Sequence, residues 1–240
     1  MELFIENLLI NIFMNSTCGC ENWDTCGAKL EYFGLNGKAA LIRAILYYKG
    51  VPFTDVRHTL EEWGALKKSG NYEFEQLPAF ECNGKRMFQS GAITLWLARQ
   101  FDLLGSNSNE EYLHISLLFS LDDFLPKVIP AIFALTEEGR AQMETKRIEF
   151  FNVHAGHFLK IFENRFLQNN GEYAVGNKFG LSDVLFTVAL HNIFKSAARK
   201  DTWEPLLNEN APNLAKHIQK ISENELAPYF AKGFINDVPL

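Results

Sequence analysis

The chain has 240 residues, of which 47% are hydrophobic and 22% charged, and its formal net charge is -6. This length and composition are typical of a globular protein with one large domain or two smaller ones. Because the net charge is negative, a nucleic-acid backbone or an anionic membrane would on the whole repel the protein. We therefore expect neither nucleic acid nor a membrane among its partners.

Cysteines are concentrated near the N-terminus. Cys18, Cys20 and Cys26 lie within the first 26 residues, and the rest of the chain contains only Cys82. This distribution does not fit a secreted fold stapled by disulfides. The spacing of one and then five residues, without a nearby histidine, is also a poor match to a zinc site. We expect no bound metal.

Residues 1–28 lie outside the predicted fold. The stretch from Met1 to Met14 is apolar enough to resemble a signal peptide, but Glu2 and Glu6 interrupt it and no lysine or arginine precedes it. It is also too short and too polar to span a membrane. A disordered or lightly docked extension, or a mis-assigned start, is favoured, and a targeting segment stays the alternative.

From Lys29 to about Gly105, the pattern predicts a βαβ-ββα unit, which is a small mixed sheet with helices packed on it. Strand segments alternate apolar and polar residues, whereas helical segments place apolar residues three and four positions apart. Asn83-Gly84 is a strong turn dipeptide and joins the last two strands as a hairpin. Strands are expected at 29–33, 52–57, 77–82 and 85–89, and helices at 41–48, at 61–68 and from Ser90 onward.

After about Gly105 the strand signals stop. Residues 107–109 are typical of a linker and a helix cap, and only helical patterns follow them. The segment 184–194 is apolar on nearly every side, which predicts a helix buried inside a bundle. Residues 106–240 are therefore predicted to form an all-α domain, and the fold class is α+β. Helices are expected at about 110–135, 138–168, 181–198 and 211–222.

Gln89-Ser90-Gly91 stands where a strand passes into an amphipathic helix. The Ser90 hydroxyl lies just ahead of the apolar helical face, where it can satisfy one of the backbone amides that lack an intrahelical partner. A helix start also carries about half a positive charge, so it can bind a carboxylate or a phosphate. An anion site and a plain N-cap are both open from these residues alone.

Several short motifs in the first domain, followed by an all-helical domain, resemble those of a family. They are Glu31-Tyr32-Phe33, Gly37, Arg43, Trp63, Lys67, Leu77-Pro78 and Gln89-Ser-Gly-Ala-Ile93. Together they resemble a cytosolic glutathione transferase, with a thioredoxin-like first domain. More narrowly, they resemble the sigma class, which includes the glutathione-dependent prostaglandin D synthases. The resemblance covers about residues 29–235.

This resemblance implies a cytoplasmic, homodimeric enzyme of detoxification that uses glutathione as co-substrate. The thiol of glutathione has a pKa near ~8.5, so only a small fraction is thiolate at neutral pH. Tyr32 is implied to stabilise the thiolate by donating its phenolic hydrogen bond, which is worth about 1.5–3 kcal/mol. The alternative is that Tyr32 is only a core aromatic residue.

The other parts of glutathione are assigned by the same resemblance. Leu77 is implied to exchange backbone hydrogen bonds with the cysteinyl unit, as an added strand would. The γ-glutamyl carboxylate is implied to meet Ser90, and the glycine carboxylate to meet Trp63 and Lys67, which lie on one helical face. A packing tryptophan and a solvated lysine are the alternatives there. The implied glutathione-binding residues are Tyr32, Lys38, Trp63, Lys67, Gln76, Leu77, Pro78, Gln89 and Ser90.

Three departures from the family pattern stand out. Lys38 replaces the usual arginine and loses its fork of donors, so both a water-mediated role at the thiolate and a merely solvated lysine are open. The acids expected to meet the glutathione amine from a partner subunit are shifted to Asp122 and Asp123, which are either surface charges or substitutes. Gly180 replaces the serine or threonine of a capping box before Asp183, at an expected cost of about 1 kcal/mol.

The second substrate is expected to lie against the helical domain. Its apolar pocket is predicted from Phe33, Phe124, Ile129, Pro130 and Phe133, although most aromatic residues at helical spacing belong to a core. We expect conjugation of glutathione to hydrophobic electrophiles. The alternatives are a prostaglandin H to D isomerase, and a non-catalytic protein that binds glutathione or apolar ligands or is structural, like the crystallins related to this class.

Overall fold

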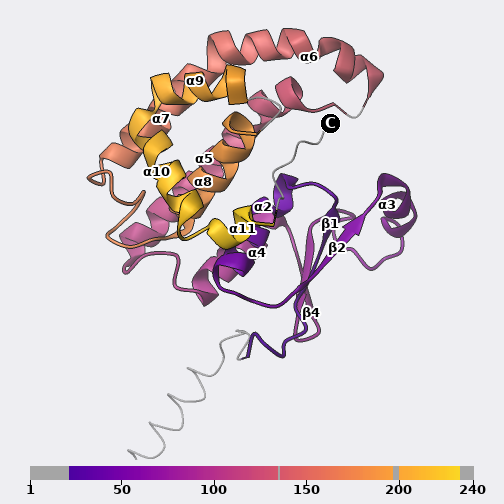
Figure 1. Cartoon of the computed structure of the whole chain (residues 1–240). Helices are drawn as coiled ribbons and strands as arrows, with labels where there is room; N and C mark the ends of the chain where they lie inside the picture. The colour runs from indigo at the N-terminus through magenta and orange to yellow at the C-terminus, as the bar shows by residue number, and fades with distance from the viewer. Residues whose placement is uncertain (1–21, 135, 197–199, 233–240) are drawn as a thin grey trace, which may run out of the picture.

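The computed structural model describes residues 22–134, 136–196 and 200–232. A four-stranded sheet with helices comes first, and a helical domain follows (Figure 1). Residues 1–21 of the predicted extension lie outside the described residues. The described part of this extension, residues 22–28, packs against the first domain. The Trp23 ring packs 4.6 Å from that of Phe101, and Cys26 is buried.

The sheet has the strand order β2-β1-β3-β4, with β1 and β2 parallel and the other pairs antiparallel. Asn83 and Gly84 both have positive φ angles, 52° and 72°, as the predicted tight hairpin between β3 and β4 requires. The predicted βαβ-ββα order is confirmed. The elements are β1 (Lys29–Phe33), η1 (Gly37–Ala39), α2 (Ala40–Tyr48), β2 (Thr54–His58), α3 (Leu60–Leu66), β3 (Ala79–Cys82), β4 (Lys85–Phe88) and α4 (Ser90–Gln100).

The helical domain contains the long α5 and a set of helices packed around α8. Its elements are α5 (Ser108–Ile132), α6 (Glu137–Glu149), η2 (Phe150–Ala155), α7 (Gly156–Leu167), α8 (Leu181–Phe194), α9 (Lys200–Asn210), α10 (Pro212–Glu223) and α11 (Ala227–Phe230). Nearly every residue of α8 is buried, which confirms the predicted central helix. None of the helices described is both long and apolar enough to cross a membrane.

Two helix predictions need correction. The helix expected at 138–168 contains a π-helical stretch, η2, between α6 and α7. The sequence pattern missed α9, because this helix is polar, contains Pro205, and buries only Trp203 and Leu207. Those two residues are four apart and therefore share one face.

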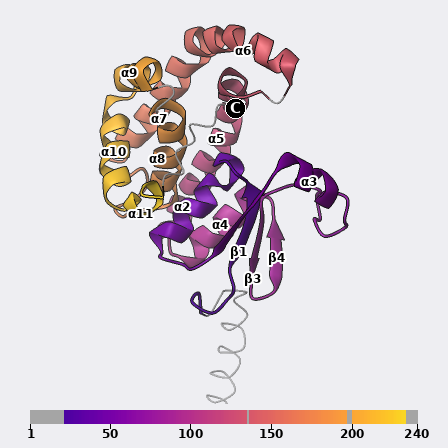
Figure 2. The same ribbon diagram turned by 45° about the vertical axis from the view of Figure 1, so that its right-hand side comes forward.

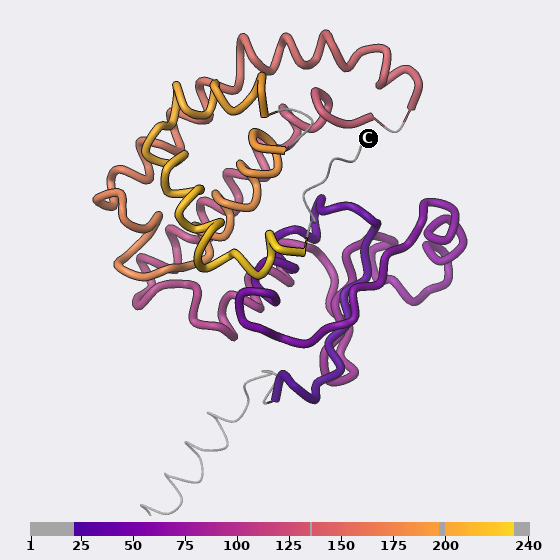
Figure 3. The backbone as a smooth tube through the Cα atoms, in the orientation of Figure 1, coloured from indigo at the N-terminus to yellow at the C-terminus, as the bar shows by residue number. Residues whose placement is uncertain are grey.

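Helices α2 and α4 lie between the sheet and the helical domain, and α3 lies on the side away from it (Figures 1 and 2). The short α11, at the yellow end of the tube, returns to the first domain beside α2 (Figure 3). The first domain therefore presents one face of its sheet to solvent and α3, and buries the other beneath two helices.

The start of α8 is capped differently from the expectation. The Asp183 carboxylate accepts the amide of Gly180 at 2.9 Å, as predicted for half of a capping box. The other half comes from α5, since His114 Nδ1 accepts the amide of Ser182 at 3.2 Å. A Cβ atom on Gly180 would lie 2.6 Å from His114 Cε1. The imidazole thus occupies the space that a capping side chain at position 180 would need.

Candidate functional site

Three predicted site segments meet at one edge of the sheet, namely the edge where the strand β1 ends. In the register of the sheet, Glu31 faces Ala79 on β3, and Ala79 faces Phe88 on β4. Continued by one residue, the same register places Tyr32, Pro78 and Gln89 in one row. The Leu77-Pro78 peptide bond is cis. The sheet therefore gathers residues that lie up to 57 positions apart, from Tyr32 to Gln89, near the end of β1.

Tyr32 is 7% exposed, and its hydroxyl oxygen accepts the backbone amide of Lys38 at 3.0 Å. The close approach requires a glycine, because a Cβ atom on Gly37 would lie 2.6 Å from this hydroxyl. Burial raises the pKa of Tyr32, although the Lys38 amide and the charge of Arg43 act in the opposite direction. The phenol is therefore protonated at neutral pH, and its proton can be donated to an anion.

Ser90 is the first residue of α4 and not its N-cap, which corrects the plain capping interpretation. The N-cap residue is Gln89, whose φ of 69° is left-handed, and it makes no side-chain capping bond. Gln89 Nε2 instead donates to Gln76 Oε1 at 3.1 Å. The first amides of α4 and the Ser90 hydroxyl thus stand together at a positive helix end.

Trp63 is the middle residue of α3 and is half-buried, whereas Lys67 is exposed and caps the C-terminal end of this helix. The Trp63 ring is perpendicular to that of Phe33, with centroids 6.3 Å apart, and Phe33 in turn contacts Tyr32. Trp63, one of the two anchors predicted for the glycine carboxylate, is therefore connected to Tyr32 through Phe33.

Lys38 connects the two domains. Its Nζ atom donates to Asp122 Oδ1 on α5 at 2.7 Å, with side chains 47% and 49% exposed. Both groups lie at the surface, where each is the ion-pair partner of the other. The ion pair brings α5 to the edge of the sheet where Tyr32 lies.

Phe124 does not line an open pocket, which corrects that prediction. It is 0% exposed and packs against Phe158 and Phe162, with ring centroids 5.0 and 5.8 Å away. The reason is helical geometry, because a residue two positions from Asp122 points to the opposite side of α5. Ile129, seven positions from Asp122, shares its side and is 37% exposed. Phe133 follows the last residue of α5, half-buried, and Pro130 is exposed.

Arg43, which the sequence analysis assigns only to a family motif, supports the site directly. It is buried, donates to both oxygens of Asp55, and donates to the carbonyl of Leu35 at 2.7 Å. Its guanidinium also lies 5.9 Å from the centre of the Tyr32 ring. The signal in the sequence is an arginine within the otherwise apolar α2.

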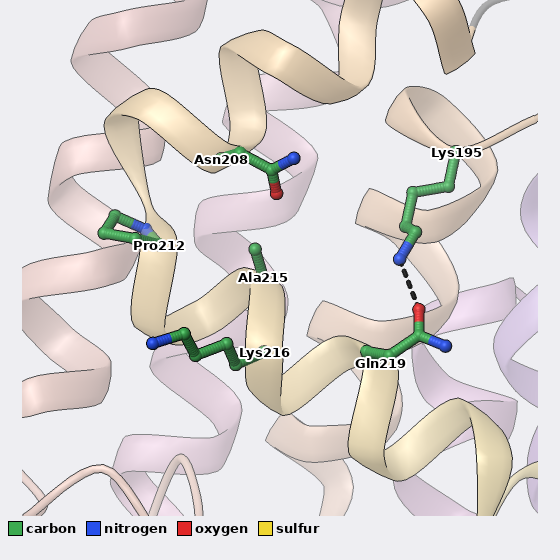
Figure 4. Close-up of a pocket in the computed structure, with 6 residues that line it drawn as sticks. All are labelled: Lys195, Asn208, Pro212, Ala215, Lys216 and Gln219. Atoms are coloured by element: carbon green, nitrogen blue, oxygen red, sulfur yellow. Dashed lines mark hydrogen bonds between the residues drawn. The ribbon is translucent and has the colours of Figure 1, made fainter.

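A separate cavity of about 320 Å³ lies on the helical domain, between α8, α9 and α10 (Figure 4). Lys195 reaches across it to Gln219, and none of the predicted site residues lines it. Within the described ranges, no group of three histidine, cysteine or acidic side chains is arranged to hold a metal ion.

Comparisons with known proteins match both domains. Residues 28–99 match the model for the N-terminal domain of glutathione S-transferases, and residues 122–233 match the model for their C-terminal domain. A glutathione S-transferase of Anopheles gambiae is 32% identical over 211 residues, which cover 88% of this chain and 98% of the relative.

Solved structures agree with the sequence relatives. A glutathione S-transferase of Caenorhabditis elegans superposes with a TM-score of 0.71 at 27% identity, covering 87% of this chain and 97% of its own. One from Necator americanus, described as monomeric, has a TM-score of 0.71 at 25% identity, covering 86% and 97%.

Proposed function

Because the chain belongs to the glutathione S-transferase family, we propose that it joins the thiolate of glutathione to hydrophobic electrophiles at the sheet edge formed by Tyr32, Leu77 and Ser90. With an aryl halide, the carbon–sulfur bond forms as the carbon–halogen bond breaks, and halide and the thiol proton leave. The electrophile occupies the space between this edge and the side of α5 that carries Asp122 and Ile129.

The proposal is supported most directly by the hydrogen bond that the Tyr32 hydroxyl oxygen accepts. Its oxygen already accepts the amide of Lys38, so the phenolic proton is the part that remains for a ligand. Burial raises the pKa of the phenol, so Tyr32 acts as a donor to the thiolate and not as a base. A hydrogen bond to an ionised sulfur is worth about 1.5–3 kcal/mol, enough to lower the thiol pKa by one to two units.

Three further contacts fix the tripeptide around this bond. The backbone of Leu77 receives the cysteinyl unit as an added strand, next to Pro78. Ser90 and the first amides of α4 bind the γ-glutamyl carboxylate, because a helix N-terminus favours an anion. Trp63 and Lys67 bind the glycine carboxylate. Gln76 and Gln89, joined to each other, close the site between these anchors.

Tyr32→Phe tests the proposal because it removes only the hydroxyl. We expect kcat with a chromogenic aryl halide to fall about tenfold or more, with the dissociation constant of glutathione changed by less than about twofold. The pKa of bound glutathione, read from thiolate absorbance, should rise in the variant. Tyr47→Phe, on the same domain but away from the row, is the matched control. Unchanged kcat would remove Tyr32 from this role.

A non-catalytic role gives a different result in the same experiment. Retention of the wild-type protein on immobilised glutathione without turnover of any aryl halide would support a ligand-binding protein. Absence of binding would overturn the assignment of the whole sheet edge.

Within the glutathione S-transferase family, we propose that the chain belongs to the sigma class. The proposal is based on the residues that carry the resemblance, among them Glu31-Tyr32-Phe33 and Gln89-Ser90. With this class we also propose a role in detoxification and a cytoplasmic location.

A two-fold dimer is proposed as well, because Tyr112 and Phe119 are 63% and 59% exposed on α5, and large exposed aromatic side chains often mark interfaces. Sedimentation equilibrium of the wild type and of Phe119→Ser tests the dimer. A wild-type monomer, as described for the Necator americanus relative, would overturn it.

A further inference from the structure

A buried carboxylate lies on the face of the sheet opposite Tyr32. Glu31 follows Leu30 on β1 and precedes Tyr32, so its side chain points toward α3, and it is 6% exposed. Four groups contact its oxygens: Tyr72 Oη at 2.7 Å, Arg86 Nη2 at 2.9 Å, and Lys29 Nζ and His58 Nε2 at 3.1 Å.

A buried charged group must be compensated by hydrogen bonds or opposite charges, and the Glu31 carboxylate has four such partners. Burial by itself raises the pKa of Glu31, but the hydrogen bonds from Tyr72, His58 and Lys29 outweigh it and lower the pKa to about 2. Glu31 is therefore ionised at all ordinary pH values. An ionised carboxylate without partners would be costly here, so the groups around it are held firmly in place.

Tyr72 links this carboxylate to the proposed glutathione site. The Tyr72 ring is perpendicular to the Trp63 ring, with centroids 4.9 Å apart, while its hydroxyl donates to Glu31. The Arg86 guanidinium lies 4.8 Å from the centre of the Tyr72 ring and donates to the carbonyl of Asn71 at 2.9 Å. Glu31 and Arg86 thus hold both the Tyr72 side chain and the backbone next to it, and we call these contacts of Glu31 and Arg86 the clamp.

The clamped segment needs such support because hydrophobic packing supplies little. Helix α3 has seven residues and buries none of them fully. Between Lys67 and Gln76 the chain has no helix or strand, and Tyr72 is its one buried side chain among residues 67–76. Segments with few buried contacts open easily, so the position of Trp63 and Lys67 depends on the Tyr72 anchor.

We propose that Glu31 and Tyr72 are positioning residues for glutathione, which hold Trp63 and the 67–76 loop in the geometry that receives the glycine carboxylate. This inference rests on the proposed glutathione site. Neither residue touches the tripeptide; both act through Trp63 and the loop. Loss of the clamp should therefore weaken recognition of the glycine end and leave the thiolate chemistry at Tyr32 unchanged.

The experiment compares Tyr72→Phe and Glu31→Gln with the wild type, using glutathione and γ-glutamylcysteine, which lacks the glycine. With glutathione, we expect KM and the dissociation constant to rise about fivefold or more, with kcat at saturation changed less than twofold. With γ-glutamylcysteine, the variants and the wild type should bind equally, since the carboxylate that the clamp serves is absent. Glu81→Gln is the matched control, because Glu81 pairs with Lys29 and Arg86 without contacting Tyr72.

The outcomes separate the inference from the function on which it rests. Failure of the wild type to bind glutathione would overturn both. Wild-type binding with an unchanged glutathione KM in Tyr72→Phe would overturn the inference alone. Equal losses for both thiols would also overturn it, because they would indicate a general structural defect. Tyr72→Phe keeps the buried ring, so it decides the question even where Glu31→Gln fails to fold.

Discussion

The two domains hold their important side chains by different means. In the thioredoxin-like domain, polar contacts fix the site: the Lys38 amide on Tyr32, Arg43 on Asp55, and the donors around Glu31. In the helical domain, aromatic packing dominates, and the Phe150 and Trp203 rings stack 5.3 Å apart beside the buried Phe124. Directional polar contacts position reacting groups, whereas non-directional apolar packing mainly provides stability.

This difference explains which site predictions agree with the geometry. Polar residues at motif spacing, such as Tyr32 and Ser90, stand at one sheet edge. Phe124, an aromatic residue chosen from the helical domain, lies in the core instead. Four measurements test this contrast between the domains.

The largest effect is expected at Phe124. If the helical domain is mainly a packed core, Phe124→Ala should lower the free energy of unfolding by about 3–5 kcal/mol, because it leaves a cavity among three phenylalanine rings. Urea unfolding measures this loss. Ile129→Ala, at a partly exposed position on the other side of α5, should cost less than about 1.5 kcal/mol. A stable Phe124→Ala variant with a raised KM for the electrophile would restore the pocket interpretation.

The next effect is the pH dependence of the helical domain. Burial lowers the pKa of His114 to about 4, from an ordinary value of 6.5, against the charges of Asp183 and Glu110. As the pH falls from about 6.5 to 4, the unfolded chain binds the proton first, so the free energy of unfolding should fall by on the order of 3 kcal/mol.

Denaturant titrations at several pH values measure this dependence. His114→Asn keeps an acceptor near the Ser182 amide but cannot titrate, so its free energy of unfolding should fall less steeply over this range. Burial also lowers the pKa of His191 to about 4, and its contribution is common to both proteins. Parallel pH curves for the wild type and the variant would contradict a neutral, buried His114.

A smaller effect with a reversed sign is expected at Gly180. The sequence pattern suggests that Gly180→Ser would restore a capping box and stabilise α8 by about 1 kcal/mol. The structure predicts a loss of about 1–3 kcal/mol, because the added Cβ would lie within 3.0 Å of both His114 and the Leu103 carbonyl. Thermal unfolding tests the sign. The loss should shrink in a His114→Ala background, and an undiminished loss would place the conflict elsewhere.

The smallest effect is expected at the ion pair between the domains. Lys38 and Asp122 are both about half exposed, so their coupling energy in a double-mutant cycle with alanine should be about 0.2–1 kcal/mol and decrease with salt. A salt-independent coupling well above that range would show that this contact is desolvated. The two domains would then be joined by polar contacts as well as by packing.

The sequence alone determined the features whose causes are local along the chain. The Asn83-Gly84 turn, the strand β1 and the buried helix α8 each depend on a few neighbouring residues, and the structure confirms them. The family pattern also placed Leu77-Pro78 next to the start of β3 and Ser90 at the start of α4, although Leu77, Pro78 and Gln89, which were predicted as strand residues, lie just outside β3 and β4.

Contacts between segments far apart in sequence became visible only in the folded structure. The Lys38 and Asp122 pair, the His114 cap on α8 and the anchoring of Tyr72 by Glu31 join residues 84, 68 and 41 positions apart. Sequence periodicity gives the face of an element but not the partner that meets it, and that partner is set by packing of the whole chain. For this reason sequence reasoning assigns no partner to Asp122, places Phe124 in a pocket and treats Glu31 only as part of a motif.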